Sequence, residues 1–484
     1  MKKLLELGQA QLASGLNGGG FFNDVGGLWQ AALGLNAFMS SDSLSGLVAG
    51  ASASAEPGSG VVTDNLWAGA SIVYGSNAGY LYLWGDGGKM YYTDLSGDNI
   101  VVYTGTTVAS PANGLDIFKT STSNYLYYFQ LTQIGRAALD ASGAITGYTS
   151  NWATGLQSTK HHPTHPFLDR LYYGNGYYVG YIYDVAGTAT NLATALDMPT
   201  DWLATCLSND GQYLVIGATK NLDTNSNPAG IYTETKILFW DTNANSWQKE
   251  YTLPSASINA LKRVGSTIYA VCPEGVYAFN FNEQPVLIRE LSNTNGIRFG
   301  FPNAIDQYGD GVIFGNELTV VGKPASYAKR GIYTPLLNPA STSGDVGLIW
   351  VNPRINRVLL STLNSKWYRL TTNTNGAPNK AWKTKLLDLG GRFKIQQIEF
   401  ILGAALASGD AITVSVVNEA LTATTFNAVS FTNDGAVTRV KTVPDASTPT
   451  DAPETELMGL TLTITGGVPL IRKINVYGEP VVQT

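Results

Sequence analysis

The chain has 484 residues and a formal net charge of −6, and only 14% of its residues are charged, against about 25% in typical soluble proteins. The negative balance gives no long-range attraction for phosphate backbones, so nucleic acid is not expected as the main partner. No apolar run reaches the roughly 18 residues of a membrane-spanning helix. The length favours two or three folding units, and the 26 tyrosines favour strands while the 53 glycines favour the turns between them.

Residues 1–64 are rich in glycine, alanine, serine and leucine and predict an irregular amino-terminal arm with a short helix at Lys2–Ala13. Glu6 and Gly8 interrupt the apolar run that a signal peptide requires, so export by that route is not expected. The apolar side chains of this arm predict docking on a neighbouring chain. The residues expected to make that contact are Leu4, Leu5, Phe21, Phe22, Leu28, Trp29, Leu33 and Phe38.

Short apolar and aromatic segments repeat through residues 65–381. Their central residues are separated by 45, 45, 43, 54, 44 and 46 positions. This period is typical of β-propeller blades, which are four-stranded sheets packed radially, and seven units predict a seven-bladed propeller. The one long interval contains "KNLDTNSNPAGIYTE", which predicts a loop insertion. The seven central residues are Leu81, Leu126, Leu171, Leu214, Ile268, Val312 and Val358.

Aspartate recurs after the first three segments, with glycine three positions later, at 94–97, 140–143 and 184–187. Aspartate at the first position and glycine at the fourth favour a turn that closes a hairpin. The related stretch "WDTNANSW", with Asp241 at its second position, has the early spacing of a calcium loop. It lacks the glycine and the distal glutamate of such a loop, so a turn is favoured over calcium.

All three histidines lie in "KHHPTHPFLDRLYYGNG". His161, His162 and His165 could converge on Zn²⁺ or Fe²⁺. Pro163 and Pro166 hold the segment extended, where adjacent side chains point to opposite faces, so ordinary hydrogen-bonding roles are favoured. No metal or other cofactor is therefore predicted.

The only two cysteines are Cys206 and Cys272. A secreted disulfide scaffold would carry more, so the sequence favours two buried free thiols. A single disulfide between them is the alternative.

Residues 382–484 change to longer alternating segments. "AITVSVVNEA" places Ile412, Val414 and Val416 on one face and Thr413 and Ser415 on the other. Strict period two indicates half-buried antiparallel strands, which predict a carboxy-terminal β-sandwich. The predicted class is all-β, with an arm at 1–64, a propeller at 65–381 and a sandwich at 382–484.

The "FLDRLYYGNG"-type blades followed by "WKTKLLDLGGRFKIQQIEF" resemble structural proteins in the tails of tailed bacteriophages. The resemblance covers most of the chain and concerns the order of the predicted domains and the residue composition of their strands. It implies a virion protein at the tail tip, nozzle or fibre attachment, made in the host cytoplasm without a signal peptide. Other virion proteins would be its partners, in a symmetric assembly with several copies. It carries over no catalytic residue, so a non-enzymatic role is expected.

Two alternatives remain open. In a glycan-binding module that recognises a host surface receptor, exposed aromatics of "GYLYLWGDGGKMYY" would stack on sugar rings, although their phase with the repeat favours blade packing. In a propeller glycosidase, arginines from different units would have to converge. No nucleophile elbow, P-loop or dinucleotide fingerprint supports an enzyme. The candidate arginines are Arg136, Arg170, Arg263, Arg298 and Arg330.

Overall fold

The computed structural model shows an all-β chain: every helix or strand assigned in its described residues is a strand. Among these residues no helix has the length and apolarity of a membrane span. The structure describes residues 2–7, 29–31, 37–39, 47–49, 51–55, 62–74, 78–95, 100–221, 232–291, 297–308, 311–315, 319–322, 332–335, 345–352, 357–363, 366–372, 380–384, 386–402, 406, 408–409, 411–420, 422–430, 438–444, 453–465 and 471–481.

The chain divides into two compact units. The first unit, the propeller unit, comprises Ala53–Asn316 and Thr342–Leu370. The second, the carboxy-terminal unit, comprises Met1–Ser52, Glu317–Ser341 and Thr371–Thr484. This division differs from the expected boundaries at 64 and 381, because the first 52 residues group with the carboxy-terminal unit and do not form a region of their own.

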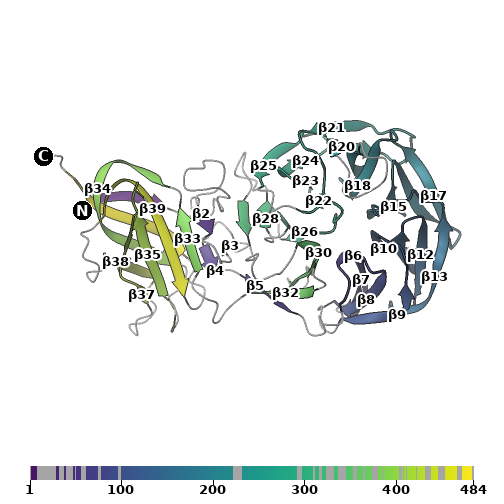
Figure 1. Cartoon of the computed structure of the whole chain (residues 1–484), viewed down its shortest axis with the longest axis horizontal. Helices are drawn as coiled ribbons and strands as arrows, with labels where there is room; N and C mark the ends of the chain where they lie inside the picture. Colours follow the sequence, from purple (N-terminus) through teal and green to yellow (C-terminus); the bar gives the residue numbers. More distant parts are fainter. Residues whose placement is uncertain are drawn as a thin grey trace. The chain divides into compact units, whose positions relative to one another are not determined.

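The propeller unit consists of antiparallel four-stranded sheets, or blades, arranged in a ring (Figure 1). Its strands are β5 (Ala51–Ala55), β6 (Leu66–Tyr74), β7 (Ala78–Gly85), β8 (Lys89–Asp94), β9 (Val101–Thr107), β10 (Pro111–Lys119), β11 (Asn124–Gln130), β12 (Gln133–Leu139), β13 (Ile145–Thr154), β14 (Thr164–Phe167), β15 (Arg170–Asn175), β16 (Tyr178–Val185), β17 (Thr188–Asp197), β18 (Trp202–Asn209), β19 (Leu214–Asn221), β20 (Tyr232–Trp240), β21 (Lys249–Leu253), β22 (Ala260–Val264), β23 (Thr267–Val271), β24 (Gly275–Phe279), β25 (Val286–Glu290), β26 (Ile305–Tyr308), β27 (Gly311–Phe314), β30 (Val346–Asn352), β31 (Arg357–Thr362) and β32 (Lys366–Thr372).

The innermost strands β6, β10, β14, β18, β22, β26 and β30 contact one another in that order, and β30 returns to β6 to close the ring. Each blade then runs outward in chain order, except that the amino-terminal β5 supplies the outer strand after β32. The predicted repeat is explained by this geometry, because all seven of its central residues lie in the second strand of a blade and are at most 2% exposed.

The expected count of seven complete blades is corrected to six. The complete blades of the propeller unit are β6–β9, β10–β13, β14–β17, β18–β21, β22–β25 and β30–β32 with β5. At the remaining position the described residues of the propeller unit form the hairpin β26–β27, whereas β28 (Thr319–Gly322) and β29 (Ile332–Pro335), which pair with each other, belong to the carboxy-terminal unit. The sequence repeat predicted β26 and β27, but it did not predict that β28 and β29 belong to the carboxy-terminal unit.

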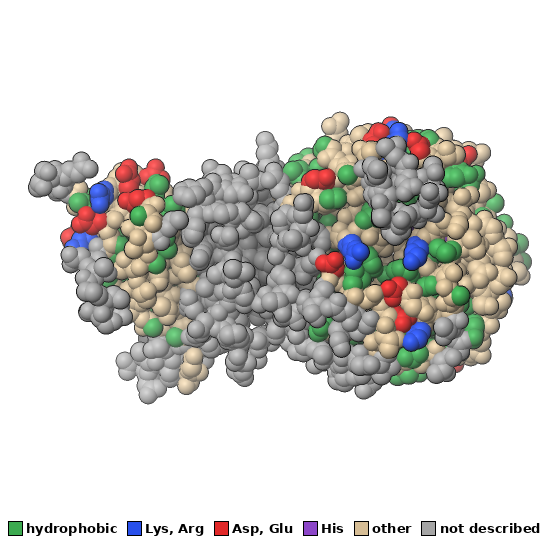
Figure 2. Space-filling view, in the orientation of Figure 1, with side chains coloured by type: hydrophobic (Ala, Val, Ile, Leu, Met, Phe, Trp, Pro, Cys, Tyr) green, Lys and Arg blue, Asp and Glu red, His purple; other side chains and the backbone are tan. Residues whose placement is uncertain are grey.

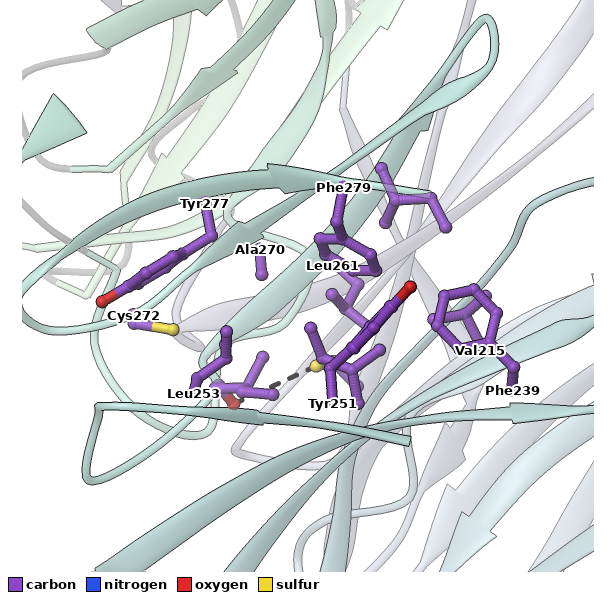
Figure 3. Close-up of a cluster of buried hydrophobic side chains, with 13 residues drawn as sticks. Val215, Phe239, Tyr251, Leu253, Leu261, Ala270, Cys272, Tyr277 and Phe279 are labelled. Atoms are coloured by element: carbon purple, nitrogen blue, oxygen red, sulfur yellow. Dashed lines mark hydrogen bonds between the residues drawn. The ribbon is translucent and has the colours of Figure 1, made fainter. Parts of the chain in front are cut away.

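The hydrophobic core of the propeller unit lies between neighbouring blades. One cluster joins β18–β21 to β22–β25 and includes Val215, Phe239, Ile268 and Phe279, all at most 1% exposed (Figure 3). Apolar side chains alternate along each strand, so one set faces the blade before and the other set the blade after. The ends of the expected loop insertion at 220–234 belong to β19 and β20, and residues 222–231 between them lie outside the described residues.

The remaining strands of the carboxy-terminal unit connect into one antiparallel sheet of twelve strands. They are β1 (Lys2–Leu7), β2 (Trp29–Ala31), β3 (Ala37–Met39), β4 (Leu47–Ala49), β33 (Lys380–Thr384), β34 (Leu387–Leu402), β35 (Ala411–Val417), β36 (Ala423–Thr425), β37 (Val429–Ser430), β38 (Arg439–Thr442), β39 (Glu454–Thr465) and β40 (Ile471–Pro480).

The long strand β39 changes partners along its length. Glu454–Met458 pairs with β34, whereas Gly459–Thr465 pairs with β35 and β33. The predicted alternation is present, since Ile412, Val414 and Val416 are fully buried. The expected β-sandwich is not confirmed, because β39 connects all twelve strands into one hydrogen-bonded sheet.

The expected amino-terminal helix at Lys2–Ala13 is corrected for Lys2–Leu7, and residues 8–13 lie outside the described residues. Lys2–Leu7 forms β1, which pairs antiparallel with Ile474–Gly478 of β40 and leaves Leu4 and Leu5 half-buried. Backbone hydrogen bonds to a formed sheet outweigh the local helix preference of six residues. Trp29 lies in β2, which pairs with β33, and Phe38 lies in β3, which pairs with β4. The expected contact residues Phe21, Phe22, Leu28 and Leu33 lie outside the described residues.

Candidate functional site

A cavity of about 350 Å³ opens among the innermost strands of the propeller unit. Its walls come from β14, β18, β22, β26 and the segments beside them, so three neighbouring blades and the β26–β27 hairpin contribute. Figure 2 shows charged side chains of both signs gathered near the centre of the propeller unit. We call this cavity the central pocket, and it is lined by Pro163, Thr164, His165, Cys206, Leu207, Ser208, Asn209, Leu261, Lys262, Arg263, Pro302, Asn303, Ile305 and Gln307.

Three polar side chains of the central pocket form a chain across neighbouring blades. Asn209 Nδ2 lies 2.7 Å from His165 Nε2, and Arg263 Nη1 donates to Asn209 Oδ1 at 2.6 Å. Because an amide nitrogen can only donate, His165 Nε2 accepts, so the imidazole is neutral with its proton on Nδ1. Burial, followed by the charges of Lys262 and Arg263, lowers the pKa of His165 to about 3, which agrees with a neutral ring.

Lys262, beside Arg263 on β22, is paired. Its Nζ lies 2.6 Å from Asp306 Oδ1 on β26. The Asp306 carboxylate also accepts hydrogen bonds from the backbone N–H of Gln307 and of Val351. The Asp306 carboxylate therefore has three donors, and its negative charge offsets the positive charge of Lys262.

A second acid, Asp116 on β10, lies near the same strands. Burial raises its pKa to about 7, against the opposing effects of the Ile117 N–H, the Thr164 hydroxyl and the charge of Lys262. The Ile117 N–H donates to its Oδ1 at 2.8 Å, and the side chain is half-buried.

The three histidines face different surroundings. His161 is 3% exposed and packs edge-to-face on Phe299, with ring centroids 4.9 Å apart, while Nδ1 and Nε2 of His162 lie 2.7 and 3.3 Å from the carbonyl oxygens of Gly174 and Leu131. Only His165 reaches the central pocket. The structure does not bring the three imidazoles together, and among the described residues no group of three or more His, Cys, Asp or Glu could hold a metal ion.

The expected turns are present where the structure describes them. Asp140 Oδ1 accepts from the N–H groups of Ser142 and Ala144, and Gly143 has φ of 75°. Asp184 Oδ1 likewise accepts from the Gly187 N–H. Asp241 Oδ1 is engaged by two backbone N–H groups of its own loop, which is the turn favoured over calcium there. The turn expected at 94–97 extends beyond the described residues.

Both cysteines are free and buried, as expected, and they belong to the same hydrophobic cluster (Figure 3). Burial raises the pKa of both thiols, that of Cys272 to about 12. Neither is a reactive thiolate at neutral pH.

The candidate arginines do not converge in the described part of the chain. Arg136 lies over the rings of Tyr125 and Trp152, and Arg170 lies over Tyr181. Arg298 is 62% exposed and lies near Asp345, and Arg330 lies outside the described residues. Arg263 alone lines the central pocket.

Most aromatics of "GYLYLWGDGGKMYY" are packed inside blades, including Tyr82, Trp84 and Tyr91 at most 2% exposed. Tyr80 and Tyr92 are different, because they are half-buried and line a second hollow of about 120 Å³. We call it the tyrosine hollow; its lining is Tyr80, Tyr82, Tyr92, Tyr103, Ala144 and Ile145.

Sequence reasoning missed Asn209, Lys262 and Asp306, although a signal was present. In the ladders between first and second strands, Asn209 pairs with Leu214, Arg263 with Ile268 and Gln307 with Val312, so each faces a repeat residue five positions later. Polar residues five or six positions before a repeat residue, Asn209, Lys262, Arg263 and Gln307, line the central pocket. Reading the repeat for polar as well as apolar positions would have grouped them.

No family model matches the chain, and no curated protein matches it. Similar solved structures include a chain of a mitotic checkpoint complex, with 10% identity, a TM-score of 0.43 and coverage of 66% of this chain and 95% of that chain. The WD40 domain of Pan2 from Neurospora crassa has 10% identity, a TM-score of 0.40 and coverage of 67% and 94%. The Dos1 propeller has 11% identity, a TM-score of 0.43 and coverage of 67% and 95%. At this level the similarities carry no functional argument, and the chain is assigned by its own strand topology to the β-propellers.

Proposed function

We propose that the protein is a non-enzymatic structural component of a phage virion, associated with the tail and acting through contacts with other virion proteins. The observation that supports a non-enzymatic role is the dispersal of the side chains that could do chemistry. Arg136 and Arg170 are engaged with aromatic rings of their own blades, and the two thiols are buried with raised pKa values. The virion assignment rests on the resemblance of the sequence to tail proteins in its domain order and strand composition.

The finer architecture belongs to the same proposal. We infer that the partner change along β39 folds the twelve-stranded sheet of the carboxy-terminal unit into a sandwich. A closed ring and a folded sheet are rigid shapes with little exposed strand edge, which suits a protein that packs permanently against neighbours.

The test is co-purification with particles. Intact particles are banded on a density gradient, washed with high salt, and analysed by quantitative mass spectrometry. A virion component is expected at a fixed ratio to other tail proteins across preparations and after the wash. A ratio that varies between preparations, or loss of the protein in the wash, would reject the proposal.

The tyrosine hollow favours a second candidate, glycan binding. The rings of Tyr80 and Tyr92 meet edge-to-face with centroids 6.0 Å apart, and Tyr148, 44% exposed, meets Tyr103 beside them. Half-exposed aromatic rings around a small hollow can stack on a sugar. A glycan panel should then give binding that Tyr92→Ala abolishes and that Tyr183→Ala, in a different blade, leaves intact. Equal loss in both variants, or no binding by the wild type, would remove this candidate.

A further inference from the structure

The guanidinium of Arg263 is a fixed cation in the central pocket. Its Nε donates to the Gly265 carbonyl at 2.8 Å and its Nη1 to Asn209 Oδ1 at 2.6 Å. A guanidinium has five N–H donors, so three remain without a partner among the described residues. No carboxylate of the described residues lies within ion-pair distance of Arg263, whereas Arg439 pairs with Glu399 and Arg170 lies near Asp169.

The neighbouring charges leave Arg263 as the uncompensated one. Lys262 is neutralised by Asp306, and His165 is neutral because its Nε2 accepts from Asn209. Among the described side chains that line the central pocket, Arg263 therefore carries the only positive charge without a carboxylate partner. A half-buried cation in this state favours an anion far more than a cation paired on the surface does.

Asn209 orients this cation. Its Nδ2 is held by His165 on β14, which turns its Oδ1 toward Arg263 on β22. The guanidinium plane is thus set by groups from two other places in the ring before any ligand arrives. A preoriented guanidinium matches a carboxylate with two parallel hydrogen bonds.

The remaining lining of the pocket suits hydroxyl groups. Ser208, Asn303 and Gln307 surround the same cavity, and its volume of about 350 Å³ falls within the range of small-molecule sites. We propose that the central pocket binds a small hydroxylated carboxylate of the size of a sugar acid. In this complex Arg263 binds the carboxylate, and Asn209 and His165 act as positioning residues. This proposal is independent of the virion role and of the tyrosine hollow.

The three histidines provide a direct probe. With ¹⁵N-histidine labelling, the full-length protein shows only the imidazoles of His161, His162 and His165. Titration with glucuronate up to ~10 mM should shift the His165 resonances and leave the other two unchanged, and glucose should shift none. A His165 that does not respond to glucuronate, or that responds equally to glucose, would overturn the proposal.

Variants then assign the anchor. Arg263→Gln should weaken glucuronate binding by at least about tenfold. Arg263→Lys keeps the charge but loses the planar group that makes two parallel hydrogen bonds, and should weaken binding by several-fold. Arg298→Gln, elsewhere on the surface, is the control and should change it less than about threefold. Wild-type affinity in Arg263→Gln would overturn the assignment. If Arg263→Gln does not fold, Arg263→Lys decides: unchanged affinity rejects the role of the guanidinium. Affinity for acetate equal to that for glucuronate would reject the sugar acid as the ligand.

Discussion

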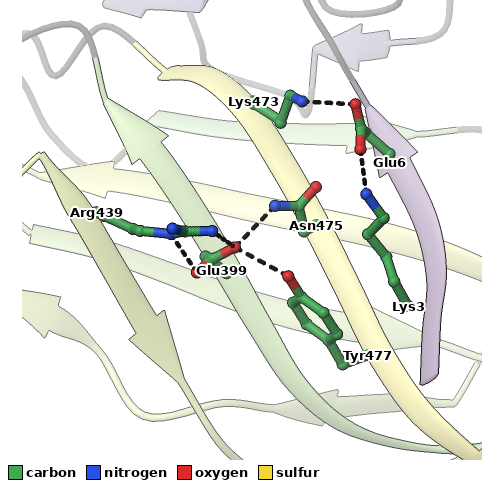
Figure 4. Close-up of polar contacts among 7 residues, drawn as sticks. All are labelled: Lys3, Glu6, Glu399, Arg439, Lys473, Asn475 and Tyr477. Carbon is green, nitrogen blue, oxygen red and sulfur yellow. Dashed lines mark hydrogen bonds and ion pairs between the residues drawn. The ribbon is translucent and has the colours of Figure 1, made fainter. Parts of the chain in front are cut away.

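The carboxylate of Glu399, 1% exposed, accepts two hydrogen bonds from the guanidinium of Arg439, at 2.7 and 3.2 Å (Figure 4). Asn475 Nδ2 and the Tyr477 hydroxyl donate to the same carboxylate, at 2.8 and 3.0 Å. These donors, Arg439 first, hold the pKa of Glu399 at about 2 in spite of its burial. Glu399 thus joins β34, β38 and β40 through one buried acceptor.

Glu399→Gln should destabilise the carboxy-terminal sheet by about 1 to 3 kcal/mol at neutral pH, because buried donors lose their acceptor. The folded pKa lies below the ordinary value of 4.5, so the ionised group stabilises the fold above about pH 4.5 and loses that effect as pH falls toward 2. Hydrogen exchange of β34 and β40 should therefore show the wild type and the variant converging as the pH falls from about 4.5 to about 2. Glu454→Gln, which removes a half-exposed partner of Arg392, should change exchange little. A pH-independent gap between Glu399→Gln and the wild type would contradict this role.

Deletion of Met1–Leu7 should loosen the carboxy-terminal sheet. The deletion removes the β1–β40 ladder and the Glu6 carboxylate, whose Oε1 accepts from Lys473 at 2.6 Å (Figure 4). Faster hydrogen exchange is expected in β40 and not in β15 or β16 of the propeller unit. Glu6→Gln keeps the ladder and should have a much smaller effect. Unchanged exchange in β40 after the deletion would mean that these residues act only on a neighbouring chain, as the sequence alone predicted.

His161 and His162 should respond oppositely to replacement by leucine. Both ring nitrogens of His161 are buried without a partner among the described residues, whereas those of His162 contact two carbonyls. His161→Leu should raise the free energy of unfolding by about 1 kcal/mol, and His162→Leu should lower it by about 1 to 3 kcal/mol. Denaturant titration measures both.

The effect of His161 on the free energy of unfolding should also depend on pH. Burial lowers the pKa of His161 from 6.5 to about 4, so the unfolded chain binds a proton between these values and the folded chain does not. The free energy of unfolding should therefore fall as the pH falls from about 6.5 to about 4. His161→Leu removes this titrating group and should make that decrease smaller. Destabilisation by His161→Leu at every pH would show that its nitrogens have partners.

Cys206 and Cys272 should be unreactive in the folded protein. Their burial in one cluster and their raised pKa values leave almost no accessible thiolate at neutral pH. Thiol titration without reductant should find no reactive group before denaturation and two after it. Finding none after denaturation would establish a disulfide.

The parts of the fold that repeat locally could be predicted from the sequence. Leu126 and Leu171 recur in phase because each occupies the buried second strand of a blade, and Asp140 with Gly143 marks a turn through local hydrogen bonds. The course of residues 2–7 could not be predicted, because six residues carry too little pattern and their partner strand lies at the other end of the chain. The polar chain from His165 to Arg263 depends on the closure of the ring, which no local pattern describes.

The central claim, that this chain is a structural protein of a phage tail, is tested most directly by electron microscopy of intact particles labelled with an antibody against the propeller unit. The account predicts label at one fixed place on the tail of most particles, and none on particles assembled without this chain. Label absent from intact particles, with the protein confined to the unassembled fraction of the lysate, would contradict it.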